Sequence, residues 1–266
     1  MLPMDRFDAD FHGAADIAVS PDNYAPLRNL ADIERMERVP FEARARPLSS
    51  FGLIRRGARL DPTKTALHVL RNGDPAQSIA RVSYEDFLGN IICAANLFRS
   101  MGVGEDNAVM LMLPNLAETH YALWGAQVAG IGFSVNWMLE ASQLNALVTA
   151  AKAKVLIALG PADGFGIWDK AQRIADDSDQ IEHLIQVSAL GQADPDALDF
   201  AAALKEQPNT LTFKRAIRPD DTAIYLHTGG TTGAPKIARL KHKGMAYQRW
   251  ANSAMKGLCR GDVVFG

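Results

Sequence analysis

The chain has 266 residues, of which 48% are hydrophobic and 22% charged, a globular composition with enough length for one large domain or two small ones. Its formal net charge is −2 with both signs mixed along the sequence, so we expect neither nucleic acid nor an anionic membrane surface as a partner. The two cysteines lack CxxC spacing, the N-terminus has no signal-peptide pattern, and no apolar run reaches the roughly 18 residues of a membrane span, which indicates a cytoplasmic protein without a transmembrane segment.

The first 48 residues differ in composition from the rest. They are polar and contain five prolines, with one helical run around Leu30–Arg38. We therefore expect an N-terminal arm over residues 1–48 and a folded domain over residues 49–266.

Strands and helices are predicted to alternate from residue 83 onward. Ser83 and Asp86 have capping-box spacing, and apolar residues at helical spacing follow as far as Gly102, which predicts a helix. The pattern then predicts a strand at Ala108–Leu113, a helix opened by Asn115 and closed by Gly130, and the following further elements: a strand at Ile131–Val135, a helix near Ser142–Ala151, a strand at Lys154–Leu159, a helix near Ile167–Asp177, a strand at His183–Val187, a helix around Ala197–Lys205 and a strand at Thr222–Thr228. Short apolar strands separated by helices predict an α/β fold with a parallel, doubly covered sheet.

A loop rich in glycine and threonine follows the last of these strands. Gly229, Gly230 and Gly233 can adopt positive φ and let backbone N–H groups approach phosphate oxygens closely. The hydroxyls of Thr228, Thr231 and Thr232 add donors, Pro235 restricts the backbone, and Lys236 adds a positive charge suited to the β and γ phosphates. We predict a polyphosphate site formed by Thr228, Gly229, Gly230, Thr231, Thr232, Gly233, Pro235 and Lys236.

Two other glycine loops are excluded by spacing. A Walker A loop needs GxxxxGK followed by Ser or Thr, whereas Ala234 and Pro235 separate Gly233 from Lys236, and Ile237 follows the lysine. A GxGxxG dinucleotide fingerprint is also absent from this loop.

The stretch from His227 to Lys236 resembles the signature of the adenylate-forming superfamily, in which an aromatic residue precedes Thr-Ser/Gly-Gly-Thr/Ser-Thr/Ser-Gly-x-Pro-Lys. Further landmarks of that superfamily occur in order from about Ser49 to the end of the chain: Val82-Ser83-Tyr84, Gly102-Val103, Leu113-Pro114-Asn115, Ala129-Gly130 with Asn136, and Lys154-Val155-Leu156-Ile157. Gly229 in place of Ser, His242 six places after Lys236, and the N-terminal arm resemble fatty or aromatic acyl-CoA synthetases within the superfamily.

The resemblance implies a ligase that uses ATP, Mg²⁺ and coenzyme A. Such enzymes convert a carboxylic acid and ATP into acyl-AMP and pyrophosphate, and then transfer the acyl group to the thiol of CoA. The family's magnesium-binding and catalytic residues lie in segments that would follow Gly266, so we assign no catalytic and no metal-binding residue within these 266 residues.

The resemblance also leads us to expect that these residues are an N-terminal portion that is inactive by itself. We expect its exposed sheet edge to favour self-association into a homo-oligomer. Two alternatives stay open. One is a non-catalytic truncated homologue that binds nucleotide or a partner, and the other is a sibling adenylating enzyme that hands its acyl group to a carrier protein.

Two histidines and the tryptophans are given structural roles. His227 stands where the superfamily usually has an aromatic residue, and we expect it to be partly buried and hydrogen-bonded rather than catalytic. His242 is expected to cap or pack at the start of a helix, and Trp124, Trp137 and Trp250 are expected in the core.

Overall fold

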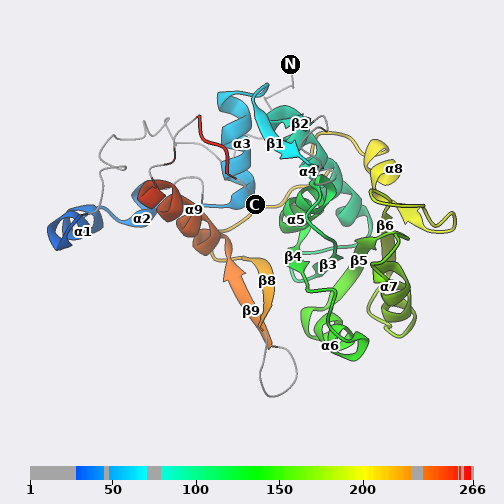
Figure 1. The fold of residues 1–266 in the computed structure, drawn as a ribbon. Coiled ribbons are helices and arrows are strands. Elements are labelled where there is room, and N and C mark those ends of the chain that lie inside the picture. Colours follow the sequence, from blue (N-terminus) through cyan, green and yellow to red (C-terminus); the bar gives the residue numbers. More distant parts are fainter. Residues whose placement is uncertain are drawn as a thin grey trace. The chain divides into compact units, whose positions relative to one another are not determined.

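The computed structural model describes residues 28–44, 48–70, 79–228, 236–256, 258 and 261–264. The elements are α1 (Leu30–Glu37), α2 (Phe41–Arg44), α3 (Ser50–Leu60), β1 (Thr65–Val69), β2 (Ala80–Ser83), α4 (Tyr84–Ser100), β3 (Ala108–Met112), α5 (Ala117–Ala129), β4 (Ile131–Ser134), α6 (Ala141–Ala151), β5 (Ala153–Leu159), α7 (Ile167–Asp176), β6 (His183–Val187), β7 (Leu198–Asp199), α8 (Phe200–Lys205), β8 (Thr222–Thr228), β9 (Lys236–Lys241) and α9 (His242–Lys256) (Figure 1). In these parts of the chain, no helix combines the length and apolar character needed to cross a bilayer.

The main sheet has the order β7-β6-β5-β3-β4-β8-β9. Every neighbouring pair is parallel except β8 and β9, which form an antiparallel hairpin at one edge. The predicted α/β fold with a mostly parallel, doubly wound sheet is therefore confirmed. A separate antiparallel pair, β1 and β2, was not predicted from the sequence.

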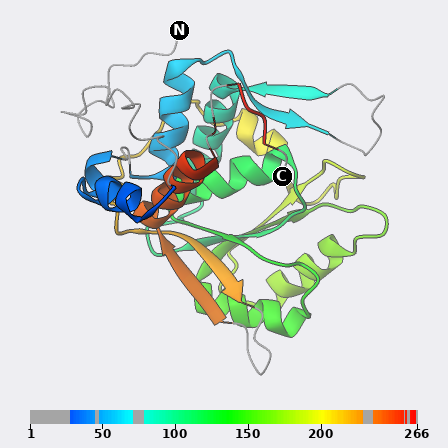
Figure 2. The same ribbon diagram turned by 60° about the vertical axis from the view of Figure 1, so that its left-hand side comes forward.

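Helices cover both faces of the sheet, as Figure 2 shows. α5 packs on β3 and β4 and against α4, whereas α7 packs on β5 and β6 and against α6. The chain crosses from β3 to β4 in one direction and from β4 back to β5 in the other, which places the right-handed crossovers on opposite faces. All five residues of β3 are buried, as expected of a central strand covered on both faces.

The predicted helix after Ser83 is confirmed as α4. The Ser83 hydroxyl accepts a hydrogen bond from the Asp86 N–H at 3.0 Å, which is the cap that the spacing predicted. Gly102 follows the helix with φ +77, a left-handed conformation that glycine adopts without strain.

The start of α5 differs from the expectation. The N-cap is Leu116, not Asn115. Thr119 supplies the local hydrogen bonds instead, because its hydroxyl donates to the Pro114 carbonyl at 2.6 Å and accepts from the Leu116 N–H at 3.4 Å.

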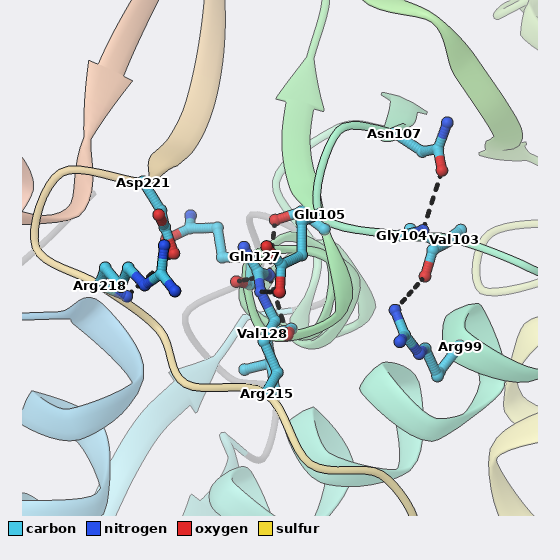
Figure 3. Close-up of polar contacts among 11 residues, drawn as sticks. Arg99, Val103, Gly104, Glu105, Asn107, Gln127, Val128, Arg215, Arg218 and Asp221 are labelled. Atoms are coloured by element: carbon cyan, nitrogen blue, oxygen red, sulfur yellow. Dashed lines mark hydrogen bonds and ion pairs between the residues drawn. The ribbon is translucent and has the colours of Figure 1, made fainter. Parts of the chain in front are cut away.

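The end of α5 is held by a buried arginine (Figure 3). The Nη1 atom of Arg215 donates to the carbonyls of Gln127, Val128 and Gly130 at 3.0–3.1 Å, and Glu105 lies 3.9 Å from its Nε. The last carbonyls of a helix lack partners within the helix and carry partial negative charge, so a guanidinium at this position stabilises them.

Two further expectations needed correction. The helix expected around Ala197–Lys205 begins only at Phe200, because Leu198 and Asp199 pair with β6 as β7. Of the three tryptophans expected in the core, Trp124 is buried, but Trp137 and Trp250 are only half-buried because each lies in a surface aromatic cluster.

The contacts divide the described residues into two units, one within residues 54–215 and 222–241 and a smaller one within residues 28–53, 216–221 and 242–264. In the smaller unit the Phe41 ring packs against Tyr247 and Trp250 of α9, with centroids 5.0 and 5.7 Å apart. His242 begins α9 and is completely buried, which confirms the packing role expected for it.

Candidate functional site

The hairpin of β8 and β9 carries the residues that flank the predicted phosphate loop. β8 covers Thr222–Thr228, the bounds that the sequence predicted, and its last residue pairs with Lys236, the first residue of β9. The other predicted loop residues, Gly229, Gly230, Thr231, Thr232, Gly233 and Pro235, lie outside the described residues. The structure thus brings together Thr228 and Lys236 at the base of the loop.

The turn end of the hairpin, where Thr228 pairs with Lys236, lies at the carboxyl edge of the parallel sheet. β8 runs parallel to β4, with Tyr225 opposite Phe133, so both strands end at the same edge. Ala223, Ile224 and Tyr225 are buried, whereas Leu226 is 42% exposed and Thr228 is exposed. β8 therefore leaves the core as it approaches the loop. Ligands of open α/β sheets bind outside the carboxyl ends of the strands, which is where this strand end stands.

The second strand of the hairpin carries three exposed basic residues. Lys236, Arg239 and Lys241 of β9 are exposed, whereas Ile237, Ala238 and Leu240 are half-buried. β9 was not predicted as a strand, and the adjacent apolar residues Ile237 and Ala238 interrupt the strict alternation that would have indicated one. Exposed lysines protect an edge strand from pairing with other chains, and near a phosphate they also supply favourable charge.

A histidine one residue before Thr228 joins β8 to the segment after β4. The Asn136 N–H donates to Nε2 of His227 at 3.0 Å, and His227 is half-buried. The expectation of a partly buried, hydrogen-bonded histidine is confirmed. No sequence signal indicates this partner, because Asn136 lies 91 residues away along the chain.

A lysine of α7 also binds the segment after β4. Nζ of Lys170 donates to the carbonyls of Trp137 and Leu139, each at 2.9 Å. A lysine at the surface of an amphipathic helix has no sequence signature for such a role, and Lys170 was not among the predicted site residues.

Other chemistry is not concentrated at this edge. The Cys93 thiol is buried and donates to the Gln207 carbonyl, and burial raises its pKa, which makes it a poor nucleophile. Among the described residues, no group of three or more His, Cys, Asp or Glu side chains could hold a metal ion. A hollow of ≈ 600 Å³ lined by Trp168, Arg173 and Asp194 lies beside β6 and β7, towards the other edge of the sheet.

Comparison with known proteins identifies one family. The model of the AMP-binding enzyme family matches residues 54–265. A marinolic acid–CoA ligase of Pseudoalteromonas sp. (strain SANK 73390) is 34% identical over 219 residues, which are 82% of this chain and 33% of that protein. A crotonobetaine/carnitine–CoA ligase of Shigella flexneri serotype 5b (strain 8401) is 28% identical over 197 residues, which are 70% of this chain and 36% of that protein. The chain thus spans about a third of the length of these relatives.

Solved structures share the fold. An anthranilate CoA ligase in complex with anthranoyl-AMP aligns with a TM-score of 0.65 and 19% identity over 81% of this chain and 38% of that chain. A benzoate CoA ligase from Burkholderia xenovorans LB400 aligns with a TM-score of 0.60 and 17% identity over 75% of this chain and 36% of that chain.

Proposed function

Because the chain belongs to the AMP-binding enzyme family, the adenylate-forming superfamily, we propose that it carries the triphosphate-binding part of an ATP-dependent acyl-CoA synthetase. In the proposed reaction a carboxylate oxygen attacks the α-phosphorus of Mg-ATP, and pyrophosphate leaves to give acyl-AMP. The thiol of CoA then attacks the acyl carbon and displaces AMP. Since the chain spans about a third of its curated relatives, this overall reaction is proposed for the whole protein.

The observation that carries the proposal is the pairing of Thr228 with Lys236 at the carboxyl edge of the sheet. This pairing places a hydroxyl and an ammonium group directly opposite each other, at the two residues that flank the predicted phosphate loop. Negative charge develops on the pyrophosphate as it leaves, and preorganised donors and a cation at that place lower the barrier. We assign the β- and γ-phosphate contacts to Thr228, Gly229, Gly230, Thr231, Thr232, Gly233 and Lys236, with Pro235 stiffening the loop before the lysine.

The proposed substrate is a carboxylic acid, and the signature favours fatty or aromatic acids. The curated relatives are ligases of a marinolic acid and of crotonobetaine or carnitine, which supports CoA as the acceptor. We propose the cytoplasm as the compartment, because both ATP and CoA are available there and the two cysteines lack the spacing of a disulfide framework.

Thioester formation by the whole protein tests the proposal. The protein would be incubated with Mg-ATP, a panel of fatty and aromatic acids, and either CoA or a phosphopantetheinyl carrier protein, with mass spectrometry of the products. We expect AMP, pyrophosphate and an acyl-CoA from at least one acid. A product found only on the carrier protein would identify the sibling activity, and the absence of AMP with every acid would contradict adenylate formation.

A further inference from the structure

The segment that follows β4 forms a tight turn over residues 136–139, here named the Asn136 turn. The Leu139 N–H donates to the Asn136 carbonyl at 3.2 Å, and the Met138 N–H donates to Oδ1 of Asn136 at 3.0 Å. The turn therefore has its own internal hydrogen bonds. Asn136 and Met138 are exposed, so the position of the turn depends on anchors from other elements.

Two anchors connect the turn to the rest of the larger unit. Lys170 of α7 donates to the Trp137 and Leu139 carbonyls, and the rings of Trp137 and Phe165 meet edge to face with centroids 6.0 Å apart. The third attachment leads to β8, because the Asn136 N–H donates to Nε2 of His227. His227 thus links the end of β8 to a turn that α7 already holds.

The hydrogen bond at His227 has a defined chemistry. An imidazole nitrogen that accepts from an amide carries no proton, so neutral His227 bears its proton on Nδ1. An aromatic ring such as Phe, which the superfamily usually has here, offers no acceptor at that point. Phenylalanine at position 227 would therefore lose this hydrogen bond.

The position of His227 in β8 connects this hydrogen bond to the proposed phosphate site. In the hairpin His227 pairs with Ile237, and the next pair is Thr228 with Lys236. The regular pairing of β8 with β4 extends only to Tyr225 opposite Phe133. Beyond that pair, the side chain of His227 attaches β8 to the segment after β4. His227 directly precedes Thr228, and its partner Ile237 directly follows Lys236.

We propose that His227 is a positioning residue, which through the Asn136 turn and Lys170 holds Thr228 and Lys236 in register with the carboxyl edge of the sheet. This inference rests on the proposed function, because its effect on ATP chemistry presupposes that Lys236 contacts phosphate. His227 itself touches no reacting atom. Without it, Lys236 keeps its charge but is held less accurately, and small misplacements weaken electrostatic stabilisation of a transition state.

The first readout is hydrogen exchange of the Asn136 amide, measured by NMR on this chain. His227→Phe removes the acceptor and should accelerate exchange of that amide by about fivefold or more, the factor that corresponds to one hydrogen bond. His227→Gln can place an amide oxygen near the position of Nε2 and should restore slow exchange, whereas the shorter His227→Asn should not. His183→Phe, at a half-buried histidine that begins β6, is the matched control and should leave Asn136 unchanged.

The second readout is ATP–pyrophosphate exchange by the whole protein. We expect His227→Phe and His227→Asn to lower kcat/KM for ATP by about fivefold or more, with His227→Gln close to wild type. Lys170→Met should lower kcat/KM as well, and its effect should be largely absent in the His227→Phe background, because both residues act through the same turn. A merely structural role would change the melting temperature without this rescue or coupling.

The outcomes separate the two proposals. A wild-type protein without ATP–pyrophosphate exchange contradicts the proposed function, whatever the Asn136 amide does. If the wild type is active and His227→Phe leaves either the amide exchange or kcat/KM at the wild-type value, the positioning role is wrong while the proposed function stands.

Discussion

One buried amide joins the connector between α8 and β8 to α4. Asn96 is 1% exposed. Its Nδ2 donates to the Pro208 and Thr210 carbonyls at 2.9 and 2.8 Å, and its Oδ1 accepts from the N–H and hydroxyl of Thr212 at 3.0 and 3.1 Å. Both donors and both acceptor sites of the side chain are thus used. Asn96 therefore attaches the first part of this connector to α4.

Replacing Asn96 tests this role. Asn96→Leu keeps the volume but removes the Asn96 partner of the Thr210 carbonyl and the Thr212 N–H and leaves the Pro208 carbonyl only the weak Cys93 thiol donor. We expect the free energy of unfolding in urea to fall by about 2–4 kcal/mol. Asn90→Leu on the same helix is the control, because the Asn90 side chain makes a single exposed hydrogen bond to the Asp86 carbonyl. Its loss should stay below about 1 kcal/mol. Equal losses for the two variants would show that the connector is not held by Asn96.

A buried phenol makes stability depend on alkaline pH. Burial raises the pKa of Tyr121 to about 12, and the nearby carboxylates of Glu118 and Asp86 act in the same direction. The folded pKa is higher than the ordinary value of 10.0, so the unfolded chain loses this proton first. The contribution to stability is complete below about pH 10 and is lost as the pH rises towards about 12.

The comparison of wild type with Tyr121→Phe isolates that effect. Between about pH 10 and pH 12 the wild type should lose more unfolding free energy than the variant, since only the wild type has this proton to lose. Urea unfolding at a series of pH values measures the difference. Parallel pH profiles for the two proteins would mean that the hydroxyl of Tyr121 ionises as readily in the fold as in water.

At the scale of elements, α4 and α5 pack closely around a glycine. A Cβ on Gly125 would lie 2.6 Å from the Cβ of Ala94 and 3.0 Å from the Ile91 carbonyl oxygen and the Ala95 nitrogen. Two of these neighbours are backbone atoms of α4, which move only if the helix moves. Gly89 of α4 offers the opposite case, because a Cβ there would meet nothing within 4 Å.

Replacing each of these two glycines by alanine should change the stability of the protein in opposite directions. Alanine has the higher intrinsic helix propensity, so Gly89→Ala should stabilise the protein by up to about 1 kcal/mol. Gly125→Ala gains the same propensity but forces α4 and α5 apart, and we expect a net loss of about 1–3 kcal/mol. Thermal unfolding of both variants measures this, and a stabilised Gly125→Ala protein would contradict the close helix contact.

At the scale of the whole molecule, the sequence predicted correctly those elements whose apolar pattern and capping residues lie within or next to the element itself. The bounds of β6 and β8 were predicted correctly because apolar strands there are bounded by polar residues, and α4 because Ser83 caps it. β7 has only two residues, exists through its pairing with β6, and has no local signal. β1 and β2 were missed for a related reason, since their residues are half-buried or exposed and give weak alternation. α3 was missed although Phe51, Ile54 and Ala58 follow helical spacing.

The candidate site likewise combines a local motif, which the sequence indicates, with long-range contacts, which it does not. Glycine and threonine spacing around Lys236 predicts a phosphate loop, which stays a prediction because residues 229–235 lie outside the described residues. Sequence could not predict the contact of His227 with Asn136, or of Lys170 with Trp137 and Leu139, because these depend on how β4, β8 and α7 are placed next to one another. The residues proposed to bind phosphate form a recognisable sequence motif, whereas the residues proposed to position them do not.

Lys236, where β9 begins, is proposed to stabilise the negative charge that develops on the departing pyrophosphate. This role can be tested by measuring ATP–pyrophosphate exchange by the whole protein for wild type and for Lys236→Ala. We expect kcat/KM for ATP to fall by about 100-fold in the variant, the usual effect of losing a group that stabilises transition-state charge. Lys241→Ala, at the other end of β9, should stay within about twofold of wild type, as expected of an exposed lysine away from the phosphates. Unchanged exchange in Lys236→Ala would contradict the claim.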